Sequence, residues 1–252
     1  MFGNIYTNFV YEPLYNGLVF LLSLLPEPAN AGIAIILFTV VVKVVLLPLS
    51  RVAIETQLKM KEIEPELSKI KAQYKGNREQ LSLKTMALYK EKGINPFSGF
   101  FLILIQIPII FALYKIFLFG GLPEFNFEFL YSFTPVPAAV NMSFLGTDLV
   151  AKSYIFALLA GVSQFLQAKY AMPPMSNSKS TEKSFQNDLA RSMHMQMKYV
   201  LPIFVFFISY HIAAAASLYW IASNIFAIFQ ELVLRKKIFS SSSQNIRVAK
   251  LK

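Results

Sequence analysis

The chain has 252 residues, of which 55% are hydrophobic and only 15% charged, and its formal net charge is +10. This composition argues against a water-soluble domain and predicts a membrane protein. The absence of cysteine excludes structural disulfides and cysteine-ligated zinc. Because His194 and His211 are too few for a metal site, we expect no bound metal.

The first 30 residues are expected to lie outside the cytoplasm and to carry a helix on the membrane surface. Their apolar run, from Leu14 to Leu25, is too short to cross a bilayer and is followed by Pro26. The segment has neither a basic start nor a small-residue cleavage site, so it is not typical of a signal peptide. An interfacial helix fits these features better.

A first transmembrane helix is predicted over residues 31–50, and it contains a single charge, Lys43. A charge inside the bilayer costs a few kcal/mol at least. Arg51 lies about 12 Å further along a helix, so a lysine stem would be strained if it reached for the interface. The other predicted spans contain one acidic residue, Glu231. We therefore favour a hydrated cavity around Lys43 over a buried ion pair or a neutral lysine.

Residues 51–96 are predicted to form a cytoplasmic antiparallel helical hairpin. Apolar side chains recur at steps of 3 and 4 over Met60–Tyr74, which indicates one helix. Asn77 has the features of a helix cap that starts the second helix, and Gly93 closes that helix. Pro65 is expected to break the first helix near its start. Such a hairpin could receive a soluble partner or cover a cavity, although a passive linker is the simpler alternative.

The later apolar runs predict four more spans, at residues 97–115, 153–170, 199–212 and 213–234. An extracytoplasmic loop is predicted at residues 116–152 and a cytoplasmic loop at residues 171–198. A basic cytoplasmic tail, residues 235–252, follows the last span. The predicted fold class is therefore an all-α, polytopic membrane protein with five transmembrane helices.

The lysine and arginine residues predict the orientation of these spans. In or beside the three predicted cytoplasmic segments lie 21 of the 24 basic residues. The positive-inside rule then places the N-terminus outside and the C-terminus in the cytoplasm. The basic tail could also bind ribosomal RNA or anionic lipid, and its Ser240–Ser243 run is expected to be disordered.

Four of the predicted spans carry small or polar side chains on one face. Serine and threonine in such positions commonly serve as hydrogen-bonding contacts between helices. For Lys43, Gln106, Gln164 and Asn224 together, a shared polar concavity is the simpler interpretation.

Single residues suggest two other functions. Ser163 and His211 could suggest an intramembrane serine protease, but Ser163 lacks the following glycine, and we do not expect an enzyme. A small secondary transporter with Lys43 at its substrate site is the main alternative. Transporters commonly contain internal repeats, and the two halves of this chain show no similarity.

Several motifs together resemble the YidC-type (Oxa/Alb) family of membrane protein insertases, over roughly Leu14 to Lys237. In the first span, a basic residue precedes Leu-Pro-Leu (Lys43 to Leu49), and the hairpin has an early proline, Pro65. The second span is entered through Gly93 to Pro96 and contains Gln106 to Pro108. The last span contains Leu218 to Asn224, followed by Gln230.

The resemblance implies a non-enzymatic insertase and chaperone in a bacterial cytoplasmic membrane. Family members form a positively charged groove that is open to the cytoplasm and the lipid and closed to the outside. By this resemblance Lys43 would be the cation, and the groove would be lined by Thr39, Gln106, Gln164, Gln167, Trp220 and Asn224. The implied partners are newly made membrane proteins and the bilayer, with the ribosome and the Sec translocon as further candidates. No nucleotide or cofactor is implied.

The sequence departs from the family pattern in two places. The family's basic residue is most often arginine, so Lys43 keeps the charge but loses the planar fork that binds a carboxylate with two hydrogen bonds. The turn before the last span usually contains Pro-Ala-Gly, whereas this chain has His211 to Ser217.

Overall fold

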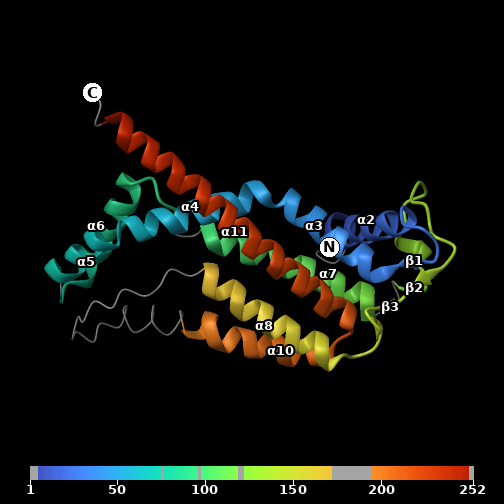
Figure 1. The fold of residues 1–252 in the computed structure, drawn as a ribbon. Coiled ribbons are helices and arrows are strands. Elements are labelled where there is room, and N and C mark those ends of the chain that lie inside the picture. The colour runs from blue at the N-terminus through green and yellow to red at the C-terminus, as the bar shows by residue number, and fades with distance from the viewer. Residues whose placement is uncertain (1–4, 75, 96–97, 119–121, 172–194, 250–252) are drawn as a thin grey trace. The chain divides into compact units, whose positions relative to one another are not determined.

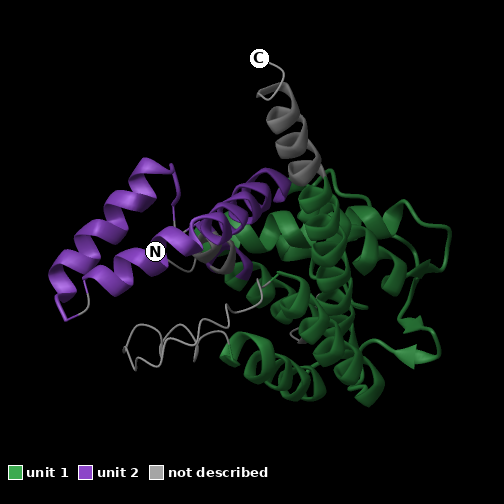
Figure 2. Ribbon diagram, turned by 60° about the vertical axis from the view of Figure 1, so that its left-hand side comes forward, with its two compact units in different colours: residues 1–45, 107–252 green, residues 46–106 purple. Residues whose placement is uncertain are grey.

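The computed structural model describes residues 5–74, 76–95, 98–118, 122–171 and 195–249, and these are mostly helical. The chain divides into two compact units (Figure 2). Unit 1 comprises Met1–Val45 and Ile107–Lys252, and unit 2 comprises Leu46–Gln106. The all-α class is thus confirmed for the described residues, apart from four strands of two residues each.

The helices of unit 1 are η1 (Thr7–Tyr11), α2 (Glu12–Ser23), α3 (Ala31–Val45), η2 (Phe127–Phe129), α8 (Tyr154–Ala171), η3 (Gln196–Val200), α10 (Leu201–His211) and α11 (Ala214–Ala249). Helix α7 (Ser98–Leu118) begins in unit 2 and ends in unit 1. Within unit 1, α8 packs against α10 and α11, α11 also packs against α3, and α3 packs against α2 (Figure 1).

The described helices include one that is long and apolar enough to cross a membrane, Ala214–Lys236. A second candidate arises when α3 and α4 (Leu47–Glu62) are counted as one interrupted span. The five-span count stays a prediction.

Helix α3 ends at Val45 and does not continue through residue 50. A break at Leu46 separates it from α4, which has Pro48 in its first turn. Proline has no backbone N–H, and its ring clashes with the carbonyl four residues earlier, so it fits the first turn of a helix and not its interior.

Helix α11 extends through the predicted tail to Ala249. The expectation of disorder at Ser240–Ser243 is therefore wrong. No glycine or proline occurs between Ala214 and Ala249, and an existing helix is extended one residue at a time at little cost.

Unit 2 contains the predicted hairpin, with α5 (Glu64–Gln73) packed against α6 (Arg78–Glu91). Its core consists of the buried residues Ile63, Leu88 and Ile94, with Met60, Leu67, Ile70 and Tyr89 packed around them. Pro65 predicts a break after Glu64. The break is present at Ile63, one residue before Glu64, and Pro65 lies in the first turn of α5. The Asn77 cap is confirmed, because the Gln80 amide donates to Asn77 Oδ1 at 3.0 Å.

Replacing Asn77 with alanine should destabilise the hairpin by about 1 kcal/mol, because the Gln80 amide loses its acceptor. The Gln80 amide should then exchange its hydrogen faster in hydrogen–deuterium exchange. Asn77→Asp keeps the acceptor and serves as the control. Unchanged exchange in Asn77→Ala would show that the cap contributes nothing.

Helices α8 and α10 approach closely at Gly161. A Cβ on Gly161 would come within 3.0 Å of Phe206 Cβ and 3.2 Å of the Pro202 carbonyl oxygen. A side chain at this position would require α10 to shift by a few tenths of an ångström, so Gly161 permits the close approach of the two helices.

Strand β1 (Ala29–Asn30) is parallel to β2 (Val140–Asn141), and β3 (Ser143–Phe144) forms an antiparallel hairpin with β4 (Thr147–Asp148). The segment 122–153 contains β2, β3 and β4, and three helices begin beside it at one end of unit 1. Asn30 Oδ1 caps α3 by accepting from the Ile33 amide, and Asn30 Nδ2 donates to the Ser143 carbonyl.

The start of α11 is fixed to the same segment. The Ala214 amide donates to the Ala151 carbonyl at 2.9 Å, and the Ala215 amide donates to the Leu149 carbonyl at 3.0 Å. Because α8 begins at Tyr154, directly after this segment, the helices predicted as the first, third and fifth spans all start at one end of unit 1.

The predicted N-terminal helix is present as α2, and its apolar face is covered by protein. Tyr15, Leu18, Val19 and Leu22 are fully buried. The packing of α2 on α3 accounts for part of this burial. Whether the helix also lies on a membrane surface stays a prediction.

Asn16 of α2 holds the segment around η2 with hydrogen bonds from both ends of its amide. Its Oδ1 accepts from the Tyr131 amide and the Thr134 hydroxyl, both at 2.7 Å. Its Nδ2 donates to the Glu12 and Phe129 carbonyls, both at 2.8 Å. Two donors and two acceptors exhaust what an asparagine side chain can offer.

Candidate functional site

Lys43 and Thr39 lie one turn apart on α3. Lys43 is half-buried in the last turn of the helix. Thr39 is fully buried, and its hydroxyl donates to the Ile35 carbonyl of the same helix at 2.6 Å. The hydroxyl hydrogen of Thr39 is thus used within α3, as is common for threonine in helices.

The middle of α8 is joined to α11 by a hydrogen bond between buried side chains. Asn224 Nδ2 donates to Ser163 Oγ at 3.1 Å, and Ser163 in turn donates to the Ala160 carbonyl at 2.9 Å. On the same helix, Gln164 Nε2 donates to Gln167 Oε1 at 3.3 Å. Buried polar side chains therefore join α8 to α11, and Ser163, which was not among the residues predicted to line the groove, is one of them.

Ser163 has a structural role in this arrangement, and not that of a nucleophile. Its hydroxyl hydrogen is directed to its own helix, and its oxygen accepts from Asn224. His211 Nδ1 lies 2.8 Å from the Phe207 carbonyl at the end of α10. These contacts supply no serine–histidine pair of the kind that a protease requires.

A second link joins the C-terminal end of α8 to the second half of α11. Arg235 forms an ion pair with Glu231, with 2.6 Å between Nε and Oε1, and its guanidinium also donates to the Ala171 carbonyl at 3.4 Å. The one acidic residue in the predicted spans is thus bound to Arg235.

The remaining candidates are Trp220, which is half-buried on α11, and Gln106, which is the last residue of unit 2. The structure thus brings together Gln164 with Gln167, and Asn224 with Ser163. The structure places each of the other four candidates, Lys43, Thr39, Trp220 and Gln106, on its helix. A groove common to all of them stays a prediction.

The chain matches a described protein family over most of its length. Residues 23–241 match the family described as 60Kd inner membrane protein. The chain belongs to this family. Membership in the 60Kd inner membrane protein family confirms the resemblance to the YidC-type proteins, and it makes the chain a polytopic membrane protein.

Individual members of the 60Kd inner membrane protein family are similar along nearly the whole chain. Membrane protein insertase YidC of Fusobacterium nucleatum subsp. nucleatum is 32% identical over 233 residues, which cover 91% of this chain and 98% of that protein. The protein of the same name from Clostridium tetani is 31% identical, covering 90% of this chain and 91% of its own length. Membrane protein insertase YidC 1 of Lactococcus lactis subsp. lactis is 29% identical, covering 96% and 82%.

The hydrogen bond between Ser163 and Asn224 should contribute about 0.6 kcal/mol to stability, the average for such contacts between membrane helices. A double-mutant cycle of Ser163→Ala and Asn224→Ala, measured by unfolding in detergent, would give this coupling energy. The buried Ser209 hydroxyl has no partner among the described residues, so a cycle of Ser209→Ala with Asn224→Ala is the control and should be additive. Equal coupling in both cycles would contradict the assignment.

Proposed function

We propose that this chain is a membrane protein insertase that recruits its clients through a charged groove. The observation that carries the proposal is the family match over residues 23–241, with relatives named insertases that are similar along nearly their whole length. The family's members move polypeptide segments into the bilayer without making or breaking a covalent bond, so the chain is not an enzyme.

The packing of the helices supports a groove around Lys43. Helix α11 contacts both α3, which carries Lys43, and α8, which carries Gln164. All three helices start at the same end of unit 1. From these starts, Lys43 lies about 18 Å along α3, and Gln164 and Asn224 lie about 15 Å along α8 and α11. The three polar side chains are therefore at similar depths, near the middle of a hydrocarbon core about 30 Å thick.

The proposed mechanism follows from the cost of moving polar groups through hydrocarbon. A client's acidic flank is attracted to the Lys43 ammonium, and the polar groove shortens the distance over which that flank is without water. The apolar part of the client then moves into lipid along the third and fifth spans. This mechanism needs a hydrated groove, because a dry site would favour the neutral lysine.

We further propose that the C-terminus and the hairpin lie in the cytoplasm, and that the end of unit 1 formed by residues 122–153 lies outside. The distribution of basic residues supports this orientation. The hairpin and the basic end of α11 are then in position to contact a ribosome or the Sec translocon.

Reconstitution in liposomes tests the function directly. The purified chain, as the sole protein, should allow a short single-span client to insert, as judged by protection from added protease. Liposomes without the chain are the control. Failure of every short client to insert would overturn the proposal.

The same liposomes separate the insertase from a small secondary transporter with Lys43 at its substrate site. A transporter should show saturable uptake of a small solute, whereas an insertase should not. Uptake without client insertion would favour the transporter.

A further inference from the structure

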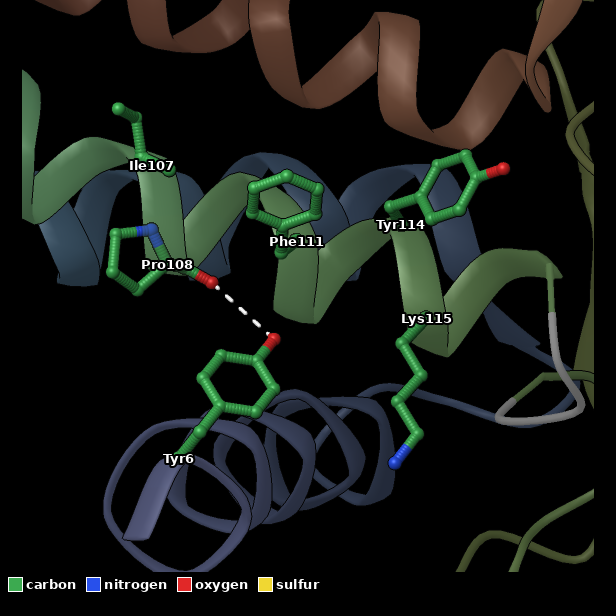
Figure 3. A pocket seen from close by; sticks show the side chains of 6 residues that line it. All are labelled: Tyr6, Ile107, Pro108, Phe111, Tyr114 and Lys115. Atoms are coloured by element: carbon green, nitrogen blue, oxygen red, sulfur yellow. Dashed lines mark hydrogen bonds between the residues drawn. The ribbon is translucent and has the colours of Figure 1, made fainter. Parts of the chain in front are cut away.

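A shallow apolar hollow lies beside the second half of α7, next to the N-terminal helices (Figure 3). It has a volume of about 430 Å³ and is lined by Tyr6, Ile107, Pro108, Phe111, Tyr114 and Lys115. None of these residues belongs to the proposed insertase groove.

The two walls of the hollow come from segments far apart in the sequence. The Tyr6 hydroxyl donates to the Pro108 carbonyl at 3.5 Å and so joins the walls (Figure 3). Two apolar side chains of α7 are left uncovered, since Phe111 is 61% exposed and Ile107 is 43% exposed. On a membrane protein, such a surface is covered by lipid or by another apolar segment.

The only cation of the lining is Lys115, in the last turn of α7. Its Nζ lies 4.2 Å from the centroid of the Tyr11 ring and 4.8 Å from that of Phe129. No ion pair of Lys115 occurs among the residues that the structure describes. The two rings thus hold the ammonium group in place without neutralising it.

The Tyr11 ring remains uncharged beside Lys115. Burial, followed by the nearby Tyr15 and Tyr6, raises the pKa of Tyr11 to about 12. The phenol therefore stays protonated at physiological pH, and the positive charge of Lys115 remains available to a ligand.

Along α7, the positive charge lies at one end of the hollow and the apolar side chains line the rest of it. Lys115 lies at the end of the helix beside Phe129 of η2. Phe111 and Ile107 lie one and two turns further into the helix, the latter about 12 Å from Lys115. A ligand that fits has an anionic group at one end and an apolar chain extending from it.

We propose that this hollow binds an anionic phospholipid, with its phosphate at Lys115 and one acyl chain against Phe111 and Ile107. A phospholipid is favoured over a client helix because the single cation stands at one end of the apolar wall. The ligand therefore needs its charge at the headgroup level and none along its chain.

The test compares phosphatidylglycerol with phosphatidylcholine of the same acyl chains, added to the full chain in detergent. Phosphatidylglycerol should raise the unfolding temperature by about 2–4 °C more than phosphatidylcholine does. Lys115→Gln should lose this difference, and Lys115→Arg should keep it. Lys152→Gln, a change of the same kind at an exposed residue of the segment 122–153, is the matched control and should behave as the wild type.

Native mass spectrometry of the same samples counts the lipids that stay bound. Phe111→Ala should lower the retention of phosphatidylglycerol, and because Phe111 is largely exposed, this variant decides the matter even if Lys115→Gln does not fold. Equal temperature shifts with the two lipids, or unchanged lipid retention in Phe111→Ala, would overturn the proposal. Neither result would bear on the insertase function, because client insertion by the wild-type chain is measured in a separate assay.

Discussion

Replacing Lys43 with glutamate should slow the insertion of clients with acidic flanks by about tenfold or more. Two charges about 4 Å apart attract by about 4 kcal/mol at an effective dielectric constant of 20, and a loss of about 1.4 kcal/mol already changes a rate or a binding constant tenfold. The glutamate replaces that attraction with repulsion. Lys43→Ala should have a smaller effect, and Lys43→Arg should be tolerated because it keeps the charge.

The rates would be measured in the liposome assay with paired clients that differ only in an acidic or a neutral flank. Lys152→Glu makes the same change of charge at an exposed residue and should insert both clients normally. Equal impairment of both clients by Lys43→Glu would indicate a loss of stability. Wild-type rates for every client in both Lys43→Ala and Lys43→Glu would show that the charged-groove mechanism is wrong.

Replacing Asn16 with leucine should destabilise the protein by about 2–4 kcal/mol. The change removes four hydrogen bonds and leaves the Tyr131 amide and the Phe129 carbonyl without their partner. Both residues are half-buried, so each unsatisfied group should cost the lower part of the range of about 1–3 kcal/mol that applies to buried groups. The segment around η2 should detach from α2 first, because these bonds join the two.

Limited proteolysis and hydrogen exchange at the Tyr131 amide would detect this detachment, and thermal unfolding would give the loss of stability. Ser23→Ala, on the same helix, removes a hydroxyl that donates only locally, to the Phe20 carbonyl, and should leave both measurements unchanged. Wild-type exchange at Tyr131 in Asn16→Leu would contradict the proposed role of Asn16.

Features of the fold that depend on neighbouring residues could be predicted from the sequence. The Asn77 cap and the break before Pro65 are present because capping and proline geometry act within one turn of the chain. The break at Leu46 follows from the same property of Pro48, although the prediction extended the helix through residue 50.

Contacts between distant segments could be predicted only in part. Asn224 was placed on a polar face, but its partner Ser163 was not predicted, because helical spacing gives the face of a residue and not its neighbour. The role of Asn16 left no local signal, since its loop partners lie more than 110 residues away. Helical spacing alone predicts a shared polar concavity for Lys43, Gln106, Gln164 and Asn224, and the family resemblance adds its use as a groove; which of these side chains meet depends on contacts that spacing does not give.

The unbroken length of α11 determines how the basic C-terminal end can meet a partner. Its 36 residues form a rod about 54 Å long, whereas the hydrocarbon core is about 30 Å thick. In the orientation proposed above, with its first turn held at one end of unit 1 by Ala214, a helix of this length would extend beyond the bilayer on the cytoplasmic side. In general, a flexible tether samples a wide volume, whereas a helical spacer keeps its two ends at a nearly constant separation and so raises the effective concentration of one end near a partner of the other.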